Sequence, residues 1–139
     1  MSELLYKDEV FKLVGLCMEI HRELGKGHDE NIYKDALVVE LQRSQIQFVR
    51  EQKYEVAYKG VVLPHHYRAD FVVWDKILFE AKAVEELTEA HMKQVLNYLA
   101  ASKLQLGLLV NFGGDSLEWK RVVLSRKNKP EPLPKDFRL

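Results

Sequence analysis

The chain has 139 residues, of which 47% are hydrophobic and 30% are charged. This length and composition predict one globular domain with its own core, and no apolar stretch is long enough to span a bilayer. The polar, acidic start of the chain does not resemble a secretory signal. A single cysteine, Cys17, excludes an internal disulfide and a thiolate zinc site. We therefore expect a cytoplasmic protein.

The charge is balanced, with 21 Lys and Arg residues against 21 Asp and Glu residues. Dedicated nucleic-acid binders usually carry a basic excess, because neutralising phosphate supplies most of their affinity. The balance argues against tight DNA binding by the monomer, but it is compatible with a local basic surface.

Two helices are predicted first. Residues 6–24 repeat apolar side chains at spacings of three and four, and Gly25 ends this helix. Asp29 can cap a second helix over about residues 30–44. The remaining elements are strands at 52–59, 61–74 and 77–84, a helix from the Thr88 cap to about 102, a strand at 104–112 and a final strand at 117–124.

The predicted order is therefore ααβββαβ(β), which belongs to the α/β class. The first strands form an antiparallel meander, and helix 88–102 makes a right-handed crossover between parallel neighbours. Strand 104–112 is continuously apolar, so we expect it to be buried on both faces. We expect residues 1–125 to form a single domain with a mixed β-sheet flanked by helices. Residues 126–139 contain three of the four prolines and are expected to be an extended tail.

The segment from Asp70 to Lys82 carries the most chemistry. Glu80 and Lys82 lie two residues apart on one predicted strand, so they share a face. A tight turn at residues 75–76 would set Asp70 opposite Glu80, to within one residue, with Cβ atoms about 5 Å apart. Two carboxylates this close repel each other unless a cation or proton lies between them. Mg²⁺ suits such a pair because it prefers oxygen ligands, and the carbonyl of Ala81 is a further candidate ligand.

Lys82 would lie beside the ion and the scissile phosphate, where it could stabilise developing charge or orient the attacking water. The alternative is that Asp70, Glu80 and Lys82 are ordinary polar positions on a solvated sheet face, since this spacing also arises by chance. The apolar neighbours in ADFVVW and ILF favour the functional interpretation, because charges within such strands usually need partners.

The helix that follows adds three side chains on one face, His91, Gln94 and Tyr98. As a nuclease feature, Gln94 would contact a water or the phosphate, while Tyr98 and His91 would contact the nucleic acid. The alternative is a simple amphipathic helix with Gln94 at its boundary.

Several blocks in order resemble one known family. The segment GHDENIY, with Gly27, Glu30 and Tyr33, fits the signature G-x-x-E-x-x-Y of the GxxExxY protein family, within the PD-(D/E)XK nuclease superfamily. The resemblance runs from about residue 6 to residue 124 and includes YRADFVVWDK, EAK, VEELTEAHMKQVLNYL and LGLLVNFGG. The spacing of Gln94 and Tyr98 also resembles the Q-x-x-x-Y element of RecB-type nucleases.

The resemblance implies a restriction-endonuclease-like core. Its helical glutamate matches Glu30, its metal-binding aspartate matches Asp70, and its E-x-K pair matches Glu80 and Lys82. The implied activity is hydrolysis of nucleic acid with Mg²⁺ or Mn²⁺, and DNA is the expected substrate. One departure is residues 28–29, His and Asp, where relatives usually carry apolar residues.

Two signature residues also have ordinary interpretations. Without the resemblance, Glu30 is a first-turn acid favoured by the helix dipole. Tyr33 is expected to hydrogen-bond toward the site and contact substrate, or else to be a half-buried core tyrosine.

Three functions remain open from the sequence. The first is a metal-dependent nuclease that acts on nucleic acid. The second is a catalytically silent module of the same fold that binds nucleic acid or a protein partner. The third is a structural subunit that forms a homodimer through exposed apolar positions.

Overall fold

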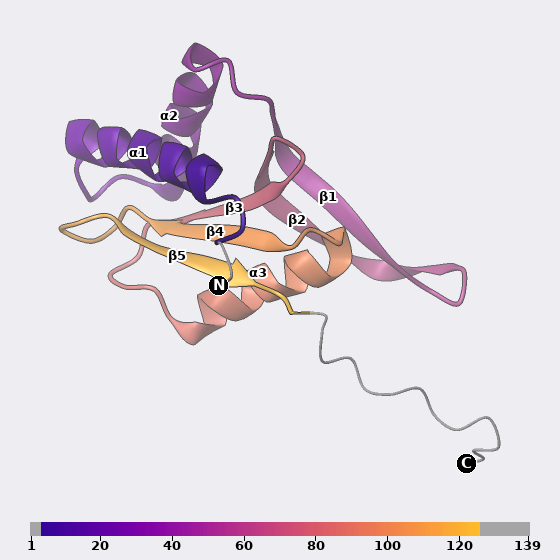
Figure 1. Cartoon of the computed structure of the whole chain (residues 1–139). Coiled ribbons are helices and arrows are strands. Elements are labelled where there is room, and N and C mark those ends of the chain that lie inside the picture. Colours follow the sequence, from indigo (N-terminus) through magenta and orange to yellow (C-terminus); the bar gives the residue numbers. More distant parts are fainter. Residues whose placement is uncertain (1–3, 126–139) are drawn as a thin grey trace.

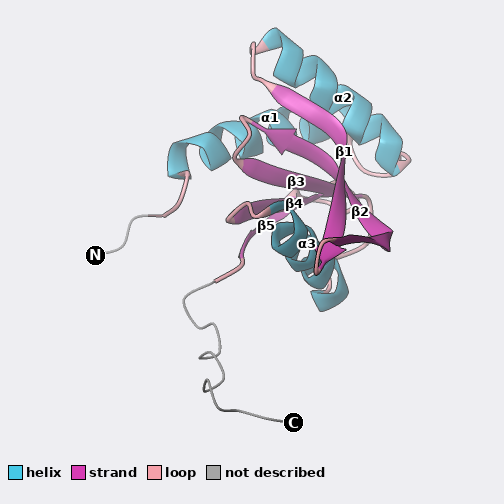
Figure 2. Cartoon of the chain, turned by 90° about the vertical axis from the view of Figure 1, so that its right-hand side faces the viewer, coloured by secondary structure: helices cyan, strands magenta, loops and turns pink. Residues whose placement is uncertain are grey.

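The computed structural model describes residues 4–125, which fold into three layers. Helices α1 (Lys7–Leu24) and α2 (Glu30–Arg43) cover one face of a β-sheet, and α3 (Glu89–Ser102) covers the other (Figures 1 and 2). The strands are β1 (Phe48–Tyr58), β2 (Val61–Val73), β3 (Ile77–Lys82), β4 (Leu106–Asn111) and β5 (Glu118–Val123). The tail predicted at 126–139 lies outside the described residues. Within those residues, no helix has the length and apolar character needed to cross a membrane.

The five strands follow one another across the sheet in the order β1-β2-β3-β4-β5. All neighbours are antiparallel except β3 and β4, which are parallel and joined by α3. The predicted meander and crossover are therefore confirmed, and the final strand pairs with β4. Strand β1 was predicted to begin at residue 52 and begins at Phe48, because Phe48 already pairs with Val73.

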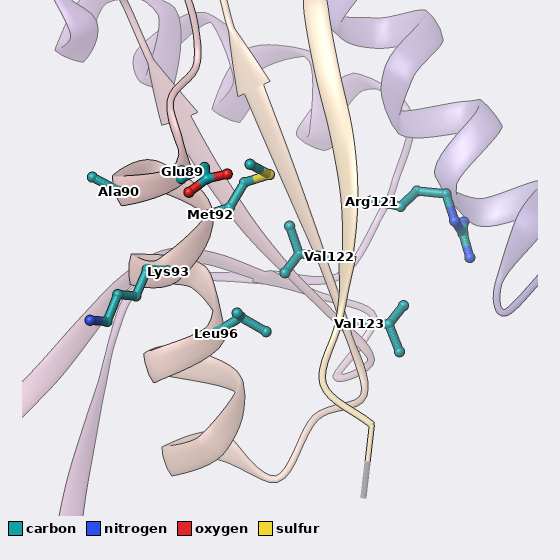
Figure 3. A pocket seen from close by; sticks show the side chains of 8 residues that line it. All are labelled: Glu89, Ala90, Met92, Lys93, Leu96, Arg121, Val122 and Val123. Atoms are coloured by element: carbon teal, nitrogen blue, oxygen red, sulfur yellow. The ribbon is translucent and has the colours of Figure 1, made fainter. Parts of the chain in front are cut away.

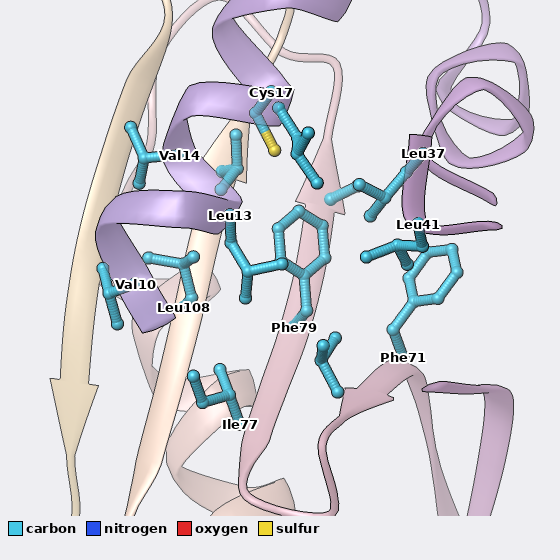
Figure 4. Packing of buried hydrophobic residues seen from close by; sticks show 14 of the residues in the cluster. Val10, Leu13, Val14, Cys17, Leu37, Leu41, Phe71, Ile77, Phe79 and Leu108 are labelled. Atoms are coloured by element: carbon cyan, nitrogen blue, oxygen red, sulfur yellow. The ribbon is translucent and has the colours of Figure 1, made fainter. Parts of the chain in front are cut away.

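Two hydrophobic cores lie on opposite faces of the sheet. The larger is formed by α1 and α2 against the sheet, with Leu13, Cys17, Leu37 and Phe79 fully or almost fully buried (Figure 4). The smaller lies under α3, where Val95 and Leu99 pack with Leu78 and Leu109. Every residue of β4 is buried, as expected of a strand covered on both faces.

The ribbon formed by β1 and β2 passes from one core to the other. Phe71 and Val73 pack into the core under α1 and α2, whereas Tyr67 and Ala69 pack into the core under α3. Because alternate residues of a strand share a face, the ribbon must twist strongly between Ala69 and Phe71. Pairing of β2 with β3 also stops at Phe71, opposite Phe79, and the ribbon projects beyond β3 (Figure 1). Asp70 therefore lies where β2 leaves β3.

The loop after β3 is held by the end of β4. Asn111 is fully buried, and its side chain accepts hydrogen bonds from the Val84 and Gly113 amides and donates one to the Val84 carbonyl. A Cβ atom on Gly113 would lie 2.2 Å from the carbonyl oxygen of Val84. Only glycine allows this close approach, which fixes the chain just beyond Lys82.

We expect Gly113→Ala to destabilise the fold by roughly 1–3 kcal/mol, because the added methyl group meets rigid backbone. Gly15→Ala is the control: it lies in the interior of α1 with open space around it, and it should stabilise the protein by about 1 kcal/mol. Urea unfolding of both variants measures the difference. Equal stability of Gly113→Ala and the wild type would contradict the packing of this loop.

Candidate active site

The two predicted carboxylates meet where β2 and β3 separate. The Asp70 amide donates a hydrogen bond to Glu80 Oε1 at 2.7 Å, and the Ala81 amide donates one to Asp70 Oδ2 at 2.8 Å. Each carboxylate thus accepts a hydrogen bond from a backbone amide of the opposite strand. The expected juxtaposition of Asp70 and Glu80 is confirmed, and the crossed bonds fix both side chains.

This arrangement makes ionisation of Glu80 unfavourable. Glu80 is 2% exposed, and burial, followed by the charge of Asp70, raises its pKa from 4.5 to about 8. The hydrogen bond from the Asp70 amide and the charge of Lys82 oppose this rise. Near neutral pH the metal-free protein therefore holds a proton on Glu80.

A lysine that the sequence analysis did not select neutralises the other carboxylates. Lys34 Nζ lies 2.8 Å from Glu30 Oε2 and 2.8 Å from Asp70 Oδ1, and its side chain is 14% exposed. Partial burial opposes its charge, but the hydrogen bonds and charges of Asp70 and Glu30 prevail and raise the pKa of Lys34 above its usual value. The available sequence signal was its position, four residues after Glu30 on one helical face.

Lys82 faces α3. Its Nζ donates a hydrogen bond to Gln94 Oε1 at 2.7 Å, a contact that the sequence analysis did not predict. Tyr98, one turn further along α3, is 8% exposed. Burial, followed by the charges of Glu80 and Asp70, raises the pKa of Tyr98 to about 12. The hydroxyl of Tyr98 thus stays protonated beside the carboxylates, available as a hydrogen-bond donor.

Two predicted substrate-binding residues, Tyr33 and His91, make structural contacts. Tyr33 is fully buried, stacks on Phe112 with ring centroids 4.7 Å apart, donates to the Gly25 carbonyl and accepts from the His28 amide. Its expected contact with substrate is therefore wrong, because the ring has no accessible surface and its hydroxyl closes the loop before α2. His91 Nδ1 accepts a hydrogen bond from the Thr88 amide and so caps α3.

The recess between α3 and β5 is not this site. Met92, Leu96 and Val122 line it (Figure 3), and none of the carboxylates or lysines described above takes part. A second recess, between α1 and β5, is lined by apolar side chains that include Phe11 and Trp119. The candidate chemistry is thus confined to the junction of α2, β2, β3 and α3.

The donor set at this junction suits a hard divalent cation. Asp70 Oδ1 already binds one cation, the Lys34 ammonium, and carboxylate oxygens are the ligands that Mg²⁺ and Mn²⁺ prefer. Within residues 4–125, however, no three His, Cys, Asp or Glu side chains are arranged to hold a metal. Glu30 reaches Asp70 only through Lys34 in this structure, so two acidic side chains, not three, meet directly.

The raised pKa of Glu80 predicts a pH dependence of stability. The folded, metal-free protein binds the Glu80 proton more tightly than the unfolded chain, whose pKa is near 4.5, so this stabilisation is complete below pH 4.5 and is lost as pH rises through about 8. Relative to Glu80→Gln, which stays neutral, the wild type should lose up to about 1.4 kcal/mol per pH unit in this window.

Urea unfolding in chelator from pH 4.5 to pH 9 measures this difference. Glu86→Gln, at an exposed position, is the control and should parallel the wild type throughout. Parallel curves for the wild type and Glu80→Gln would contradict the assignment of the proton to Glu80.

Comparison with known proteins places this chain in a family. A family model described as the PD-(D/E)XK nuclease superfamily matches residues 7–122, whereas no curated protein matches the chain. Among solved structures, SSO0001 is similar with a TM-score of 0.55 and 21% identity; the match covers 67% of this chain and 48% of SSO0001, so this chain spans about half its length. The superfamily match, together with the mixed sheet between helices, supports the predicted restriction-endonuclease-like fold.

A second neighbour is an alkaline exonuclease (LHK-Exo) from Laribacter hongkongensis. Its TM-score is 0.42 and its identity is 11%, over 90% of this chain and 73% of that one. The family assignment does not depend on this distant match, because the superfamily model covers all helices and nearly all of the sheet. The chain belongs to the PD-(D/E)XK nuclease superfamily.

Proposed function

We propose that the protein is a nuclease of the GxxExxY family that hydrolyses phosphodiester bonds in DNA with the help of Mg²⁺ or Mn²⁺. The observation that carries the proposal is the crossed pair of Asp70 and Glu80, with Lys82 on the same strand as Glu80. A binding surface has no need of two adjoining carboxyl groups, one of them buried. A metal-dependent hydrolase does, because such a pair attracts a cation and holds it near a lysine.

Each residue of the site has a proposed role. Asp70, Glu80 and the carbonyl of Ala81 are the proposed metal ligands, with Glu30 assisting directly or through water. The bound ion would supply a Lewis acid and lower the pKa of a coordinated water. Lys82, held by Gln94, would orient the attacking water and stabilise charge that develops on the phosphate. Gln94 thus contributes to catalysis chiefly by fixing Lys82.

The substrate contacts are proposed from position on α3. Tyr98 keeps its proton beside the carboxylates and would donate a hydrogen bond to a phosphate oxygen. His91 caps the start of the same helix and would contact the nucleic-acid backbone with its other nitrogen. Because the chain carries no net charge, affinity for DNA would come from these local contacts and from the metal. A cytoplasmic location and a homodimer remain predictions.

The second candidate is a catalytically silent module of the same fold that binds nucleic acid or a protein partner. Two observations favour it: the neutral charge, and the arrangement of Glu30 in the described residues, where Lys34 separates it from Asp70. The two proposals differ in what they need from Lys82, which only catalysis requires.

Cleavage assays separate these candidates. We expect the wild type to cut plasmid, linear or single-stranded DNA in Mg²⁺ or Mn²⁺, and Lys82→Met to be at least about 100-fold slower, since removing one charge-stabilising donor typically costs that much. Lys93→Met is the control because Lys93 is exposed on the same helix as Gln94. Activity that survives in Lys82→Met at the wild-type level would indicate a contaminant and favour the silent module.

Metal binding tests the site without requiring turnover. Calorimetry with Mn²⁺ should show binding to the wild type and at least about tenfold weaker binding to Asp70→Asn, which keeps an acceptor for the Ala81 amide but removes the charge. Asp35→Asn is the matched control, because Asp35 pairs with Arg50 on the surface. Equal affinity of Asp70→Asn and the wild type would exclude Asp70 as a ligand.

A further inference from the structure

Lys34 occupies an unusual position for a lysine on a helix. Its ammonium contacts one carboxylate of its own helix, Glu30, and one of the sheet, Asp70, both at 2.8 Å. Surface ion pairs are commonly exposed and contribute little, but the Lys34 side chain is 14% exposed and that of Asp70 is 13% exposed. This contact therefore links α2 to the point where β2 leaves β3.

Both carboxylate oxygens of Asp70 already have a partner. Oδ2 accepts the Ala81 amide, and Oδ1 accepts Lys34. Each oxygen keeps a further lone pair, but a divalent ion at either of them would place two further positive charges within a few ångströms of the ammonium on Oδ1. Repulsion at such a distance in a partly buried site opposes the simultaneous binding of both cations.

The second lysine of the site does not have this conflict. Lys82 Nζ is bound to the neutral oxygen of Gln94 and makes no ion pair with a carboxylate among those found in the described residues. The two lysines thus have different partners: Lys34 pairs with two acids, whereas Lys82 binds an amide.

We propose that Lys34 is the resident cation of the metal-free site and that a divalent ion must displace it from Asp70. This inference rests on the proposed metal-dependent function and adds a residue to it. One displacement releases two oxygens, Asp70 Oδ1 and Glu30 Oε2. It therefore converts a site with two adjoining acids into one in which Glu30 can also face the ion. In the metal-free state Lys34 keeps the acids from repelling one another and holds α2 against β2.

Calorimetric titration with Mn²⁺ on the full chain tests the exchange. The variant Lys34→Gln keeps a hydrogen-bond donor but removes the competing charge, so we expect it to bind Mn²⁺ at least about tenfold more tightly than the wild type. Its melting temperature in chelator should fall, and it should rise more on adding Mn²⁺. Lys26→Gln is the control, because Lys26 pairs with Asp115 and not with the site.

The outcomes separate this inference from the proposed function. If the wild type binds Mn²⁺ and Lys34→Gln binds equally or more weakly, the exchange is wrong and the metal site stands. If neither protein binds Mn²⁺, the proposed metal-dependent function fails, and the exchange with it.

A measurement on the wild type avoids any effect of substitution on folding. An amine-reactive ester labels accessible lysines, and mass spectrometry reports the rate at each position. We expect Mn²⁺ to increase the labelling rate of Lys34 and to leave that of Lys26 unchanged. A Lys34 rate that does not change at saturating Mn²⁺ would overturn the proposal.

Discussion

The site depends on the point where β2 and β3 stop pairing. Beyond this point, hydrogen bonds from backbone amides to carboxylate side chains still join the two strands. Asp70 and Glu80 accept hydrogen bonds from backbone amides of the opposite strand. Backbone donors in a protein interior need acceptors, and the two carboxylates supply them for the amides of residues 70 and 81. The same bonds hold the two acids at a fixed spacing.

The separation follows from the two cores. The ribbon of β1 and β2 buries Phe71 under α1 and α2, but it buries Tyr67 and Ala69 under α3. The ribbon must therefore twist between Ala69 and Phe71, and it separates from β3 there. The rings of Tyr67 and Tyr98, with centroids 5.6 Å apart, hold the ribbon against α3 beyond this twist. Packing on both faces of the sheet thus determines where β2 and β3 separate, and so where Asp70 and Glu80 lie.

Charge at this point is balanced in three ways. Glu80 retains a proton because burial raises its pKa to about 8, Asp70 and Glu30 share the Lys34 ammonium, and Lys82 is fixed by Gln94 close enough to lower the pKa of Glu80. In the proposed exchange, a divalent ion replaces the proton on Glu80 and the Lys34 ammonium together. Metal affinity should therefore rise with pH, since both acids must be charged to bind the ion.

Local sequence patterns predicted the order of elements and singled out Asp70, Glu80 and Lys82. Alternating and helical patterns located α1, α2 and α3, and the short connection after Val73 set the register that brings Asp70 to Glu80, because a tight turn leaves little freedom in pairing. The shared face of Glu80 and Lys82 on one strand, and that of Gln94 and Tyr98 on one helix, came from the same periodicities, since both follow from regular local geometry.

Contacts between residues distant in the sequence could not be predicted from local patterns, because they arise when the elements pack together. Lys34 reaches Asp70 because α2 packs across the sheet, and no local pattern gives that distance. Tyr33 was expected to contact substrate, but it is buried against Phe112, because the loop between α1 and α2 folds over the end of β4. The early start of β1 at Phe48 is likewise a consequence of pairing with Val73. Local propensity sets the elements, but burial and long-range contacts assign each side chain its neighbour.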